Sequence, residues 1–235
     1  MEKSDYNQDI LQILATKSST KQLVFRETTQ AFEELKKVCR NVAENLNSQI
    51  CGIDKSVVVE FEERSETEAL IRFSGDALVF HMHTNAYGVE GKHETAKSSY
   101  VRDNPMNAYF GLIHVYNFLN DSLKFNRMND IGQLVARIYV NRERHFFIEG
   151  KRQFSFIHNN LATDVFDSKK AKHIIETAIL YALKCSTLDS TPCSCELHSS
   201  LQACQSCLSR KEPSLQHVSY LNLHEHLSMR LQRTV

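Results

Sequence analysis

Residues that could carry chemistry are concentrated near the end of the chain, where cysteines occur in pairs. Five of the seven cysteines lie between Cys185 and Cys207. Cys193 and Cys195 are followed, after eight residues, by Cys204. Thiolates at both ends of a short loop can close a tetrahedral zinc site, and the metal can fold a segment too small for its own core. The set Cys193, Cys195, Cys204 and Cys207 therefore predicts either a zinc-dependent module or an unstructured tail in which such pairs arise by chance.

A second group of side chains that could bind a ligand is basic. Between residues 124 and 152, Lys and Arg outnumber Asp and Glu by seven to three, and aromatic residues run through the segment. Basic strands with aromatic side chains can hold phosphates and stack bases, as single-strand nucleic-acid binders do. The expected contacts to nucleic acid or another anionic ligand are Arg137, Arg142, Arg144, Lys151 and Arg152. The alternative is that these cations pair with carboxylates such as Glu149.

Histidines give a third and weaker pattern. His81 and His83 lie two apart on an expected strand and so project from the same face. With Glu60 or Glu62 from a neighbouring strand they could chelate a metal ion, although a plain polar face gives the same spacing. No phosphate-binding glycine loop, nucleophile elbow, HExxH or dinucleotide fingerprint occurs in the sequence. A metal-dependent enzyme is therefore a hypothesis without a catalytic motif, and no cofactor other than zinc in the tail is expected.

A long helix is the clearest element that must position these groups. Ser19 and Gln22 form the pattern of a capping box, which predicts a helix start there, and a short helix around residues 9–15 is expected before it. Apolar residues then recur every three or four positions up to Leu46, in a repeat that packs along one seam. The stripe predicts either a helix lying on the domain's own sheet or a self-association surface, with Phe25, Phe32, Leu35, Val42 and Leu46 as its contacts.

The middle of the chain predicts a β-sheet. Alternating apolar and polar residues indicate antiparallel strands at 57–62, 69–73, 77–84, 133–142 and 145–149, with a last one at 154–157. Residues 109–118 are apolar on both faces, which is typical of a covered central strand. All seven glycines fall between Gly52 and Gly150, where we expect them to supply the positive φ of hairpin turns.

The expected fold is α+β: an antiparallel sheet of about six or seven strands flanked by the long N-terminal helix and a C-terminal helix. That last helix is capped by Asp167 or Ser168 and has an apolar stripe from Ala171 to Leu183. Residues 1–184 form a single domain in this interpretation. Residues 185–235 form a Ser- and Cys-rich tail, disordered or zinc-dependent, with fewer charges than the rest of the chain.

Composition excludes some classes of protein. The 235 residues carry 28 Lys and Arg against 28 Asp and Glu, which excludes a generally basic nucleic-acid coat. No apolar run approaches the roughly 18 residues that span a bilayer, and the first ten residues are too polar for a secretory signal. We therefore expect no membrane partner and a cytoplasmic location.

Three segments carry a resemblance to a known group. The stretch Val115–Ser122 reads VYNFLNDS, residues 136–141 read ARIYVN, and residues 149–153 read EGKRQ. This pattern resembles a family of uncharacterised bacterial proteins, with similarity running from about residue 20 to residue 183. The resemblance implies a cytoplasmic bacterial protein and brings no activity, cofactor or partner. The Cys-rich tail departs from the pattern.

The sequence as a whole favours a non-enzymatic binding or assembly protein that forms a homodimer. Its support is the apolar stripe, the missing catalytic motifs and the balanced charge. Binding of nucleic acid or an anionic ligand through the basic strands is the first alternative, and a metal-dependent enzyme is the second.

Overall fold

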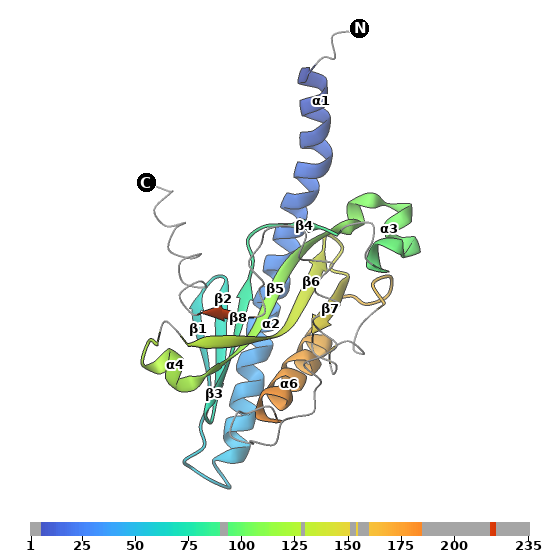
Figure 1. The fold of residues 1–235 in the computed structure, drawn as a ribbon. Coiled ribbons are helices and arrows are strands. Elements are labelled where there is room, and N and C mark those ends of the chain that lie inside the picture. Colours follow the sequence, from blue (N-terminus) through green and yellow to red (C-terminus); the bar gives the residue numbers. More distant parts are fainter. Residues whose placement is uncertain are drawn as a thin grey trace, which may run out of the picture.

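A computed structural model of the chain describes residues 6–89, 94–127, 130–150, 154, 160–184 and 217–219. One antiparallel sheet packs two helices, α2 (Ser19–Ile50) and α6 (Ser168–Lys184), against the same face (Figure 1). The α+β class, the antiparallel sheet and both flanking helices confirm the fold expected from the sequence.

The sheet is a meander interrupted by one longer connection. Consecutive strands along its main path pair antiparallel, in the spatial order β1-β2-β3-β5-β6-β7. The bounds of these strands are β1 (Val59–Ser65), β2 (Glu68–Phe73), β3 (Asp76–Met82), β5 (Tyr109–Leu119), β6 (Ile131–Asn141) and β7 (Phe146–Gly150). Two short strands pair off this path: β4 (Tyr87–Gly88) with β5, and β8 (His217–Ser219), from the Ser- and Cys-rich segment, with the start of β6. The central position of β5 agrees with its apolar sequence.

Short helical turns fill the connections between strands. The link from β4 to β5 contains η2 (Glu94–Lys97), α3 (Ser99–Asp103) and η3 (Pro105–Ala108), and α4 (Asn120–Lys124) follows β5. Val101 of α3 packs with Phe110 and Phe147 on the sheet face opposite α2 and α6, which we call the far face. The longer connection therefore covers one end of that face.

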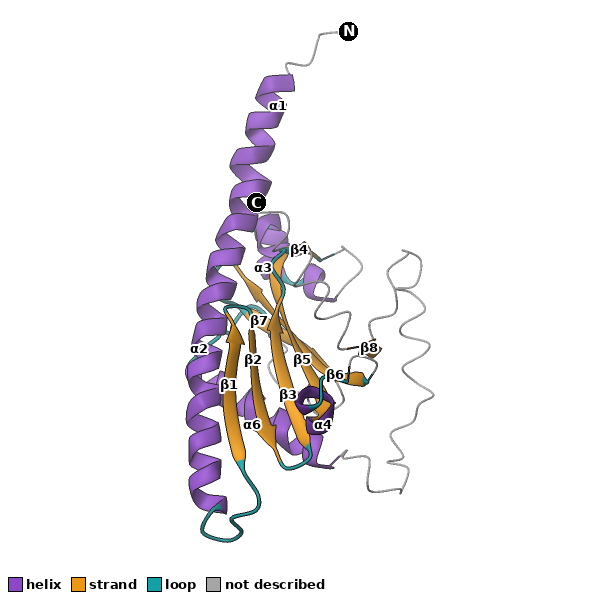
Figure 2. Ribbon diagram, turned by 90° about the vertical axis from the view of Figure 1, so that its left-hand side faces the viewer, coloured by secondary structure: helices purple, strands orange, loops and turns teal. Residues whose placement is uncertain are grey.

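The first helix does not begin where the sequence predicts. Helix α1 (Tyr6–Ile13), a π-helical turn η1 (Leu14–Ser18) and α2 run on without a break, and the side chain of Ser18 makes no capping hydrogen bond. The short preceding helix is confirmed, but the capping box at Ser19 is wrong, because the backbone before it is already helical. The helix consequently projects beyond the sheet, and no residue of α1 is buried (Figure 2).

The apolar stripe of α2 lies mainly in the chain's own core. Phe32 and Leu35 are fully buried and Val42 nearly so, in one cluster with Ile113, Val115 and other residues of the sheet and of α6. Phe25 and Leu46, at the two ends of the stripe, remain partly exposed. Of the two interpretations of the stripe, packing on the domain's own sheet accounts for its middle, so Phe32, Leu35 and Val42 are unavailable to a partner in this fold.

The described glycines do not supply the turn conformation that the sequence predicts. None of the described glycines has a positive φ, whereas Ser74, Asn126 and Arg144 do. The expectation that glycines supply the hairpin conformation is therefore wrong. A Cβ placed on Gly111 of β5 would lie 2.1 Å from Oγ1 of Thr28 on α2. The missing side chain lets the helix approach the sheet at this point.

The C-terminal helix is capped as predicted. Asp167 Oδ1 accepts the backbone N–H of Lys170 at 2.7 Å, which satisfies an amide of the first turn. No helix in the described part of the chain has the length and apolarity needed to cross a membrane. The expected last strand at 154–157 lies, apart from Phe154, outside the described residues.

Candidate functional site

The basic residues singled out by the sequence do not gather into one surface. Arg137 lies on the far face of β6 and approaches Glu149 of β7 at 4.0 Å. Arg142 pairs with Glu143 at 3.3 Å in the following turn. Arg144 extends to the other side of the sheet, where it pairs with Glu34 of α2. Strand alternation and the turn thus separate the three guanidinium groups, and each of them has a carboxylate neighbour.

The remaining members of that set, and the proposed zinc ligands, cannot be placed. Lys151 and Arg152 lie outside the described residues, as do Cys193, Cys195, Cys204 and Cys207. Cys39 is buried and Cys51 is exposed at the end of α2. Within the described ranges, no group of three or more His, Cys, Asp or Glu side chains could hold a metal ion.

The histidine pattern leads to a different arrangement from the one expected. Glu60 and Glu62 lie on β1, where Glu62 pairs with Arg72 of β2, so neither carboxylate meets a histidine. His81 instead lies opposite His114 of β5, with the two rings stacked at a centroid distance of 6.5 Å. His83 follows the end of β3 and contacts Tyr87. Chelation by His81, His83 and a β1 carboxylate is therefore wrong for this fold.

A continuous row of polar side chains crosses the far face of the sheet at this level. Glu68 of β2 is the register partner of His81, and His81 is the partner of His114. His114 in turn is opposite Arg137, and Arg137 is opposite Glu149. Register partners on one face of a sheet have Cβ atoms about 5 Å apart. We call these five residues, from five adjacent strands, the polar row.

Apolar clusters border the polar row on both sides. On one side lie Leu70, Val79 and Tyr116, two residues along their strands from row members. On the other side Phe147 packs with Phe110 in the cluster that α3 covers. On a solvent-exposed sheet face, polar side chains occupy most of the positions. Here the neighbouring positions on the same face are apolar and buried, so the polar row needs a separate explanation.

His114 lies at the centre of the row and is buried, with 6 % of its surface exposed. Burial lowers the pKa of its imidazole to about 3, and the positive charges of His81, Arg137 and His83 act in the same direction. At neutral pH the ring is therefore uncharged, with one N–H donor and one acceptor nitrogen. The described part of the chain provides no hydrogen-bond partner for either ring nitrogen.

Arg137, next to His114, has guanidinium N–H groups without a close partner among the described residues. Its guanidinium approaches Glu149 at the 4.0 Å limit of an ion pair, whereas the closer partner of the Glu149 carboxylate is the hydroxyl of Tyr139, at 2.7 Å. The sequence analysis named Arg137 but missed His114, because that histidine stands inside an otherwise apolar strand. A polar residue within such a run is the signal that could have identified it.

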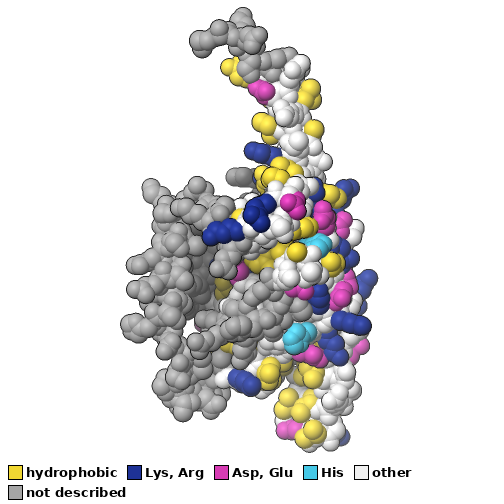
Figure 3. All heavy atoms as spheres, turned by 90° about the vertical axis from the view of Figure 1, so that its right-hand side faces the viewer, with side chains coloured by type: hydrophobic (Ala, Val, Ile, Leu, Met, Phe, Trp, Pro, Cys, Tyr) yellow, Lys and Arg dark blue, Asp and Glu magenta, His cyan; other side chains and the backbone are white. Residues whose placement is uncertain are grey.

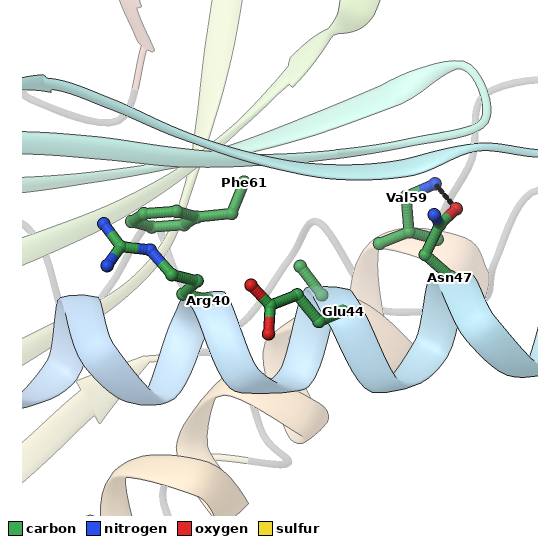
Figure 4. A pocket seen from close by; sticks show the side chains of 6 residues that line it. Arg40, Glu44, Asn47, Val59 and Phe61 are labelled. Carbon is green, nitrogen blue, oxygen red and sulfur yellow. Dashed lines mark hydrogen bonds between the residues drawn. The ribbon is translucent and has the colours of Figure 1, made fainter.

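Two hollows lie elsewhere on the surface. A groove of about 190 Å³ lies between α2 and β1. In it Arg40 lies over the ring of Phe61, and Asn47 accepts the backbone N–H of Val59 (Figure 4). These contacts fasten α2 to the edge strand, and Glu44 points into the groove between them. The groove is therefore explained by packing of the helix on the sheet.

The larger hollow lies where the projecting helix leaves the sheet. It has a volume of about 630 Å³ and is lined by Lys21, Gln22 and Phe25 of α2, by residues 84–86 after β3 and by Tyr87 of β4. The helix of residues 6–18 continues from this point away from the sheet. Figure 3 shows hydrophobic side chains spaced along it.

Comparisons of the chain with protein-family models, with curated proteins and with solved structures found no match. The arguments for function therefore rest on the chain's own residues.

Proposed function

We propose that this chain is a non-enzymatic binding and assembly protein that self-associates through its projecting helix. The observation that carries the proposal is the exposure of that helix. Tyr6, Ile10, Leu11, Ile13 and Leu14 are each more than half exposed, and α1 buries no residue. Large apolar side chains gathered on an exposed element are characteristic of interaction surfaces.

Four of these five exposed apolar residues lie on one side of the helix, and Leu11 is the exception. Tyr6, Ile10, Ile13 and Leu14 follow the spacing i, i+4, i+7 and i+8, which places them along one stripe. Gln8 and Gln12 fall on the opposite side. This end of the long helix buries no residue of α1 against the sheet, so a partner along the stripe would stabilise it.

A second copy of the chain suits this stripe. Asp9 and Lys17 are equally distant in sequence from Ile13, so two helices crossing antiparallel at Ile13 would bring Asp9 of each copy opposite Lys17 of the other. Such a two-fold arrangement is the commonest symmetry of homodimers. The hollow beside Phe25 lies next to the same helix and offers further contact area.

The contacts of this proposed dimer differ from those expected from the sequence. The stripe residues Phe32, Leu35 and Val42 are replaced by residues of α1 and η1, and Phe25 remains beside them. The cytoplasmic location and the relationship to bacterial proteins remain part of the proposal, supported by the sequence segments that suggested them.

The test is the mass of the protein in solution, measured by sedimentation and native mass spectrometry. The double variant Ile10→Glu/Leu14→Glu introduces two charges into the stripe and should convert the dimer into a folded monomer. Gln8→Glu/Gln12→Glu introduces the same charges on the opposite side and should leave the dimer intact. A monomeric wild-type protein, or equal loss of dimer in both variants, would contradict the proposal.

A further inference from the structure

We propose that the far face of the sheet binds an oxyanion, a carboxylate or a phosphate group, between Arg137 and His114. This site is independent of the projecting helix and of the proposed self-association. It uses one residue from the basic segment and one that the sequence analysis did not select. The register of β5 and β6 makes the two residues direct neighbours on the same face.

Unsatisfied donors are the first argument for a ligand. The described chain provides no hydrogen-bond partner for the imidazole of His114, although nine-tenths of the residue is buried. Among the described residues, Arg137 beside it has one ion pair, to Glu149 at 4.0 Å. Two adjacent donor side chains without close partners among the described residues leave a place that an acceptor could occupy.

The chemistry of the two donors specifies the acceptor. A guanidinium group presents a planar fork of N–H donors that matches the two oxygens of a carboxylate or phosphate. A neutral imidazole adds a third N–H without adding charge. An oxyanion accepts all three, whereas a cation or an apolar group would leave them unsatisfied.

The charge pattern of the row limits the size of the anion. Glu68, which is 5 % exposed, lies at one end of the polar row, and Glu149 lies beyond Arg137 at the other. Glu68 pairs with Arg64 at 3.5 Å and Glu149 lies 4.0 Å from Arg137, so the row has no excess of positive charge and a nucleic-acid strand running along it is disfavoured. A single small oxyanion between the ends keeps its contact with Arg137 and remains away from Glu68.

The test follows the histidine ring resonances of the full chain by NMR while inorganic phosphate or acetate is added at constant ionic strength. We expect a saturable shift of the His114 resonance, assigned with the variant His114→Gln, with one of the two anions. The resonance of His173, which is exposed on α6, should not move with the same midpoint. The two additions distinguish a phosphate site from a carboxylate site.

Substitutions of Arg137 complete the test. Arg137→Gln should weaken binding at least about tenfold, the loss expected for a charged hydrogen bond. Arg102→Gln removes the same charge from the exposed surface of α3 and should leave binding unchanged. Arg137→Lys keeps the charge without the planar fork, and should bind more weakly than wild type while remaining folded. Absence of a saturable His114 shift with both anions, or equal binding by the Arg137 and Arg102 variants, would overturn the proposal.

Discussion

Arg144 pairs with Glu34 across the interface between helix and sheet, although 110 residues separate them in the chain. Ser168, the first residue of α6, donates its hydroxyl to the same carboxylate at 2.5 Å. One side chain of α2 thus joins the β6–β7 turn to the start of the C-terminal helix. Arg144 reaches it from a backbone with a φ of 62°, a conformation that few non-glycine residues adopt.

Glu34→Gln should lower the free energy of unfolding by about 1–2 kcal/mol, since it weakens two charge-assisted hydrogen bonds at a partly exposed site. Burial raises the pKa of Glu34, but hydrogen bonds from Ser168 and Arg144 outweigh it, so the pKa lies below its ordinary 4.5. The stabilisation is therefore present above pH 4.5 and is lost as the pH falls through the lowered value. Denaturant unfolding at pH 7 and pH 3 checks both statements.

The control for this variant is Glu44→Gln, which removes a charge from an exposed position of the same helix and should change stability little. If the two variants were equally stable at pH 7, the junction at Glu34 would not contribute as described. A difference that persisted unchanged at pH 3 would contradict the assignment of the effect to the ionised carboxylate.

Gly111→Ala should destabilise the protein by about 2 kcal/mol or more, because the new methyl group overlaps Thr28 and forces α2 from the sheet. Gly75→Ala is the matched control: nothing lies within 4 Å of its added Cβ, and the change should stay within about 0.5 kcal/mol. Thr28→Ala combined with Gly111→Ala should cost less than the sum of the two single changes. Strict additivity would show that the two residues are not in contact.

Truncating residues in the middle of the α2 stripe should cost more stability than truncating residues at its ends. Phe32→Ala opens a cavity in the core and should cost about 3–5 kcal/mol of stability. Phe25→Ala, on the same helix and with the same change of side chain, should cost well under half as much because Phe25 is partly exposed. Thermal unfolding of both variants is sufficient, and similar losses would contradict the placement of the stripe.

The elements could be predicted because each is specified by local periodicity. The three-and-four spacing of α2, the alternation in β6 and the cap at Asp167 are properties of adjacent residues, and all three appear in the structure. The helix start at Ser19 was wrong because a capping pattern has meaning only where the preceding chain is not helical. Here the helix continues from Tyr6.

The polar row could not be predicted, because it depends on register between strands far apart in sequence. His81 and His114 become neighbours through the pairing of β3 with β5, which skips β4. Arg137 and Arg144 look alike in sequence, yet they end on opposite sides of the sheet because the turn after β6 redirects the second. Residue type alone therefore suggested one basic surface, whereas the fold places these arginines on opposite sides of the sheet.

Lys36 provides a prediction about a buried charge. Its side chain is 4 % exposed, and the ammonium group contacts Glu33 at 2.7 Å and Glu63 at 2.6 Å. Burial lowers the pKa of Lys36, but the two carboxylates outweigh it and the pKa is raised, so the group stays charged. The double variant Glu33→Gln/Glu63→Gln should lose about 3 kcal/mol, because it leaves the charge buried without a counter-ion.

Lys36→Met tests the same interaction by removing the cation and keeping the two carboxylates. It removes the buried charge and leaves both carboxylates able to reach water, so the change in unfolding free energy should be small, within about 1 kcal/mol. Chemical denaturation of the two variants measures the asymmetry. A loss for Lys36→Met as large as for the double variant would contradict it.

His114 makes the last prediction, which concerns acid stability. Burial and the neighbouring cations lower its pKa from 6.5 to about 3 in the folded protein, so the unfolded chain binds a proton at a higher pH than the folded one. Stability must therefore fall as the pH drops below 6.5. Between pH 7 and pH 5 the loss from this group alone is about 2 kcal/mol. His114→Phe, which keeps an aromatic ring in the buried position, should lose correspondingly less stability over that interval than wild type. Denaturant unfolding at the two pH values gives the comparison, and identical losses in both proteins would show that the imidazole does not resist protonation.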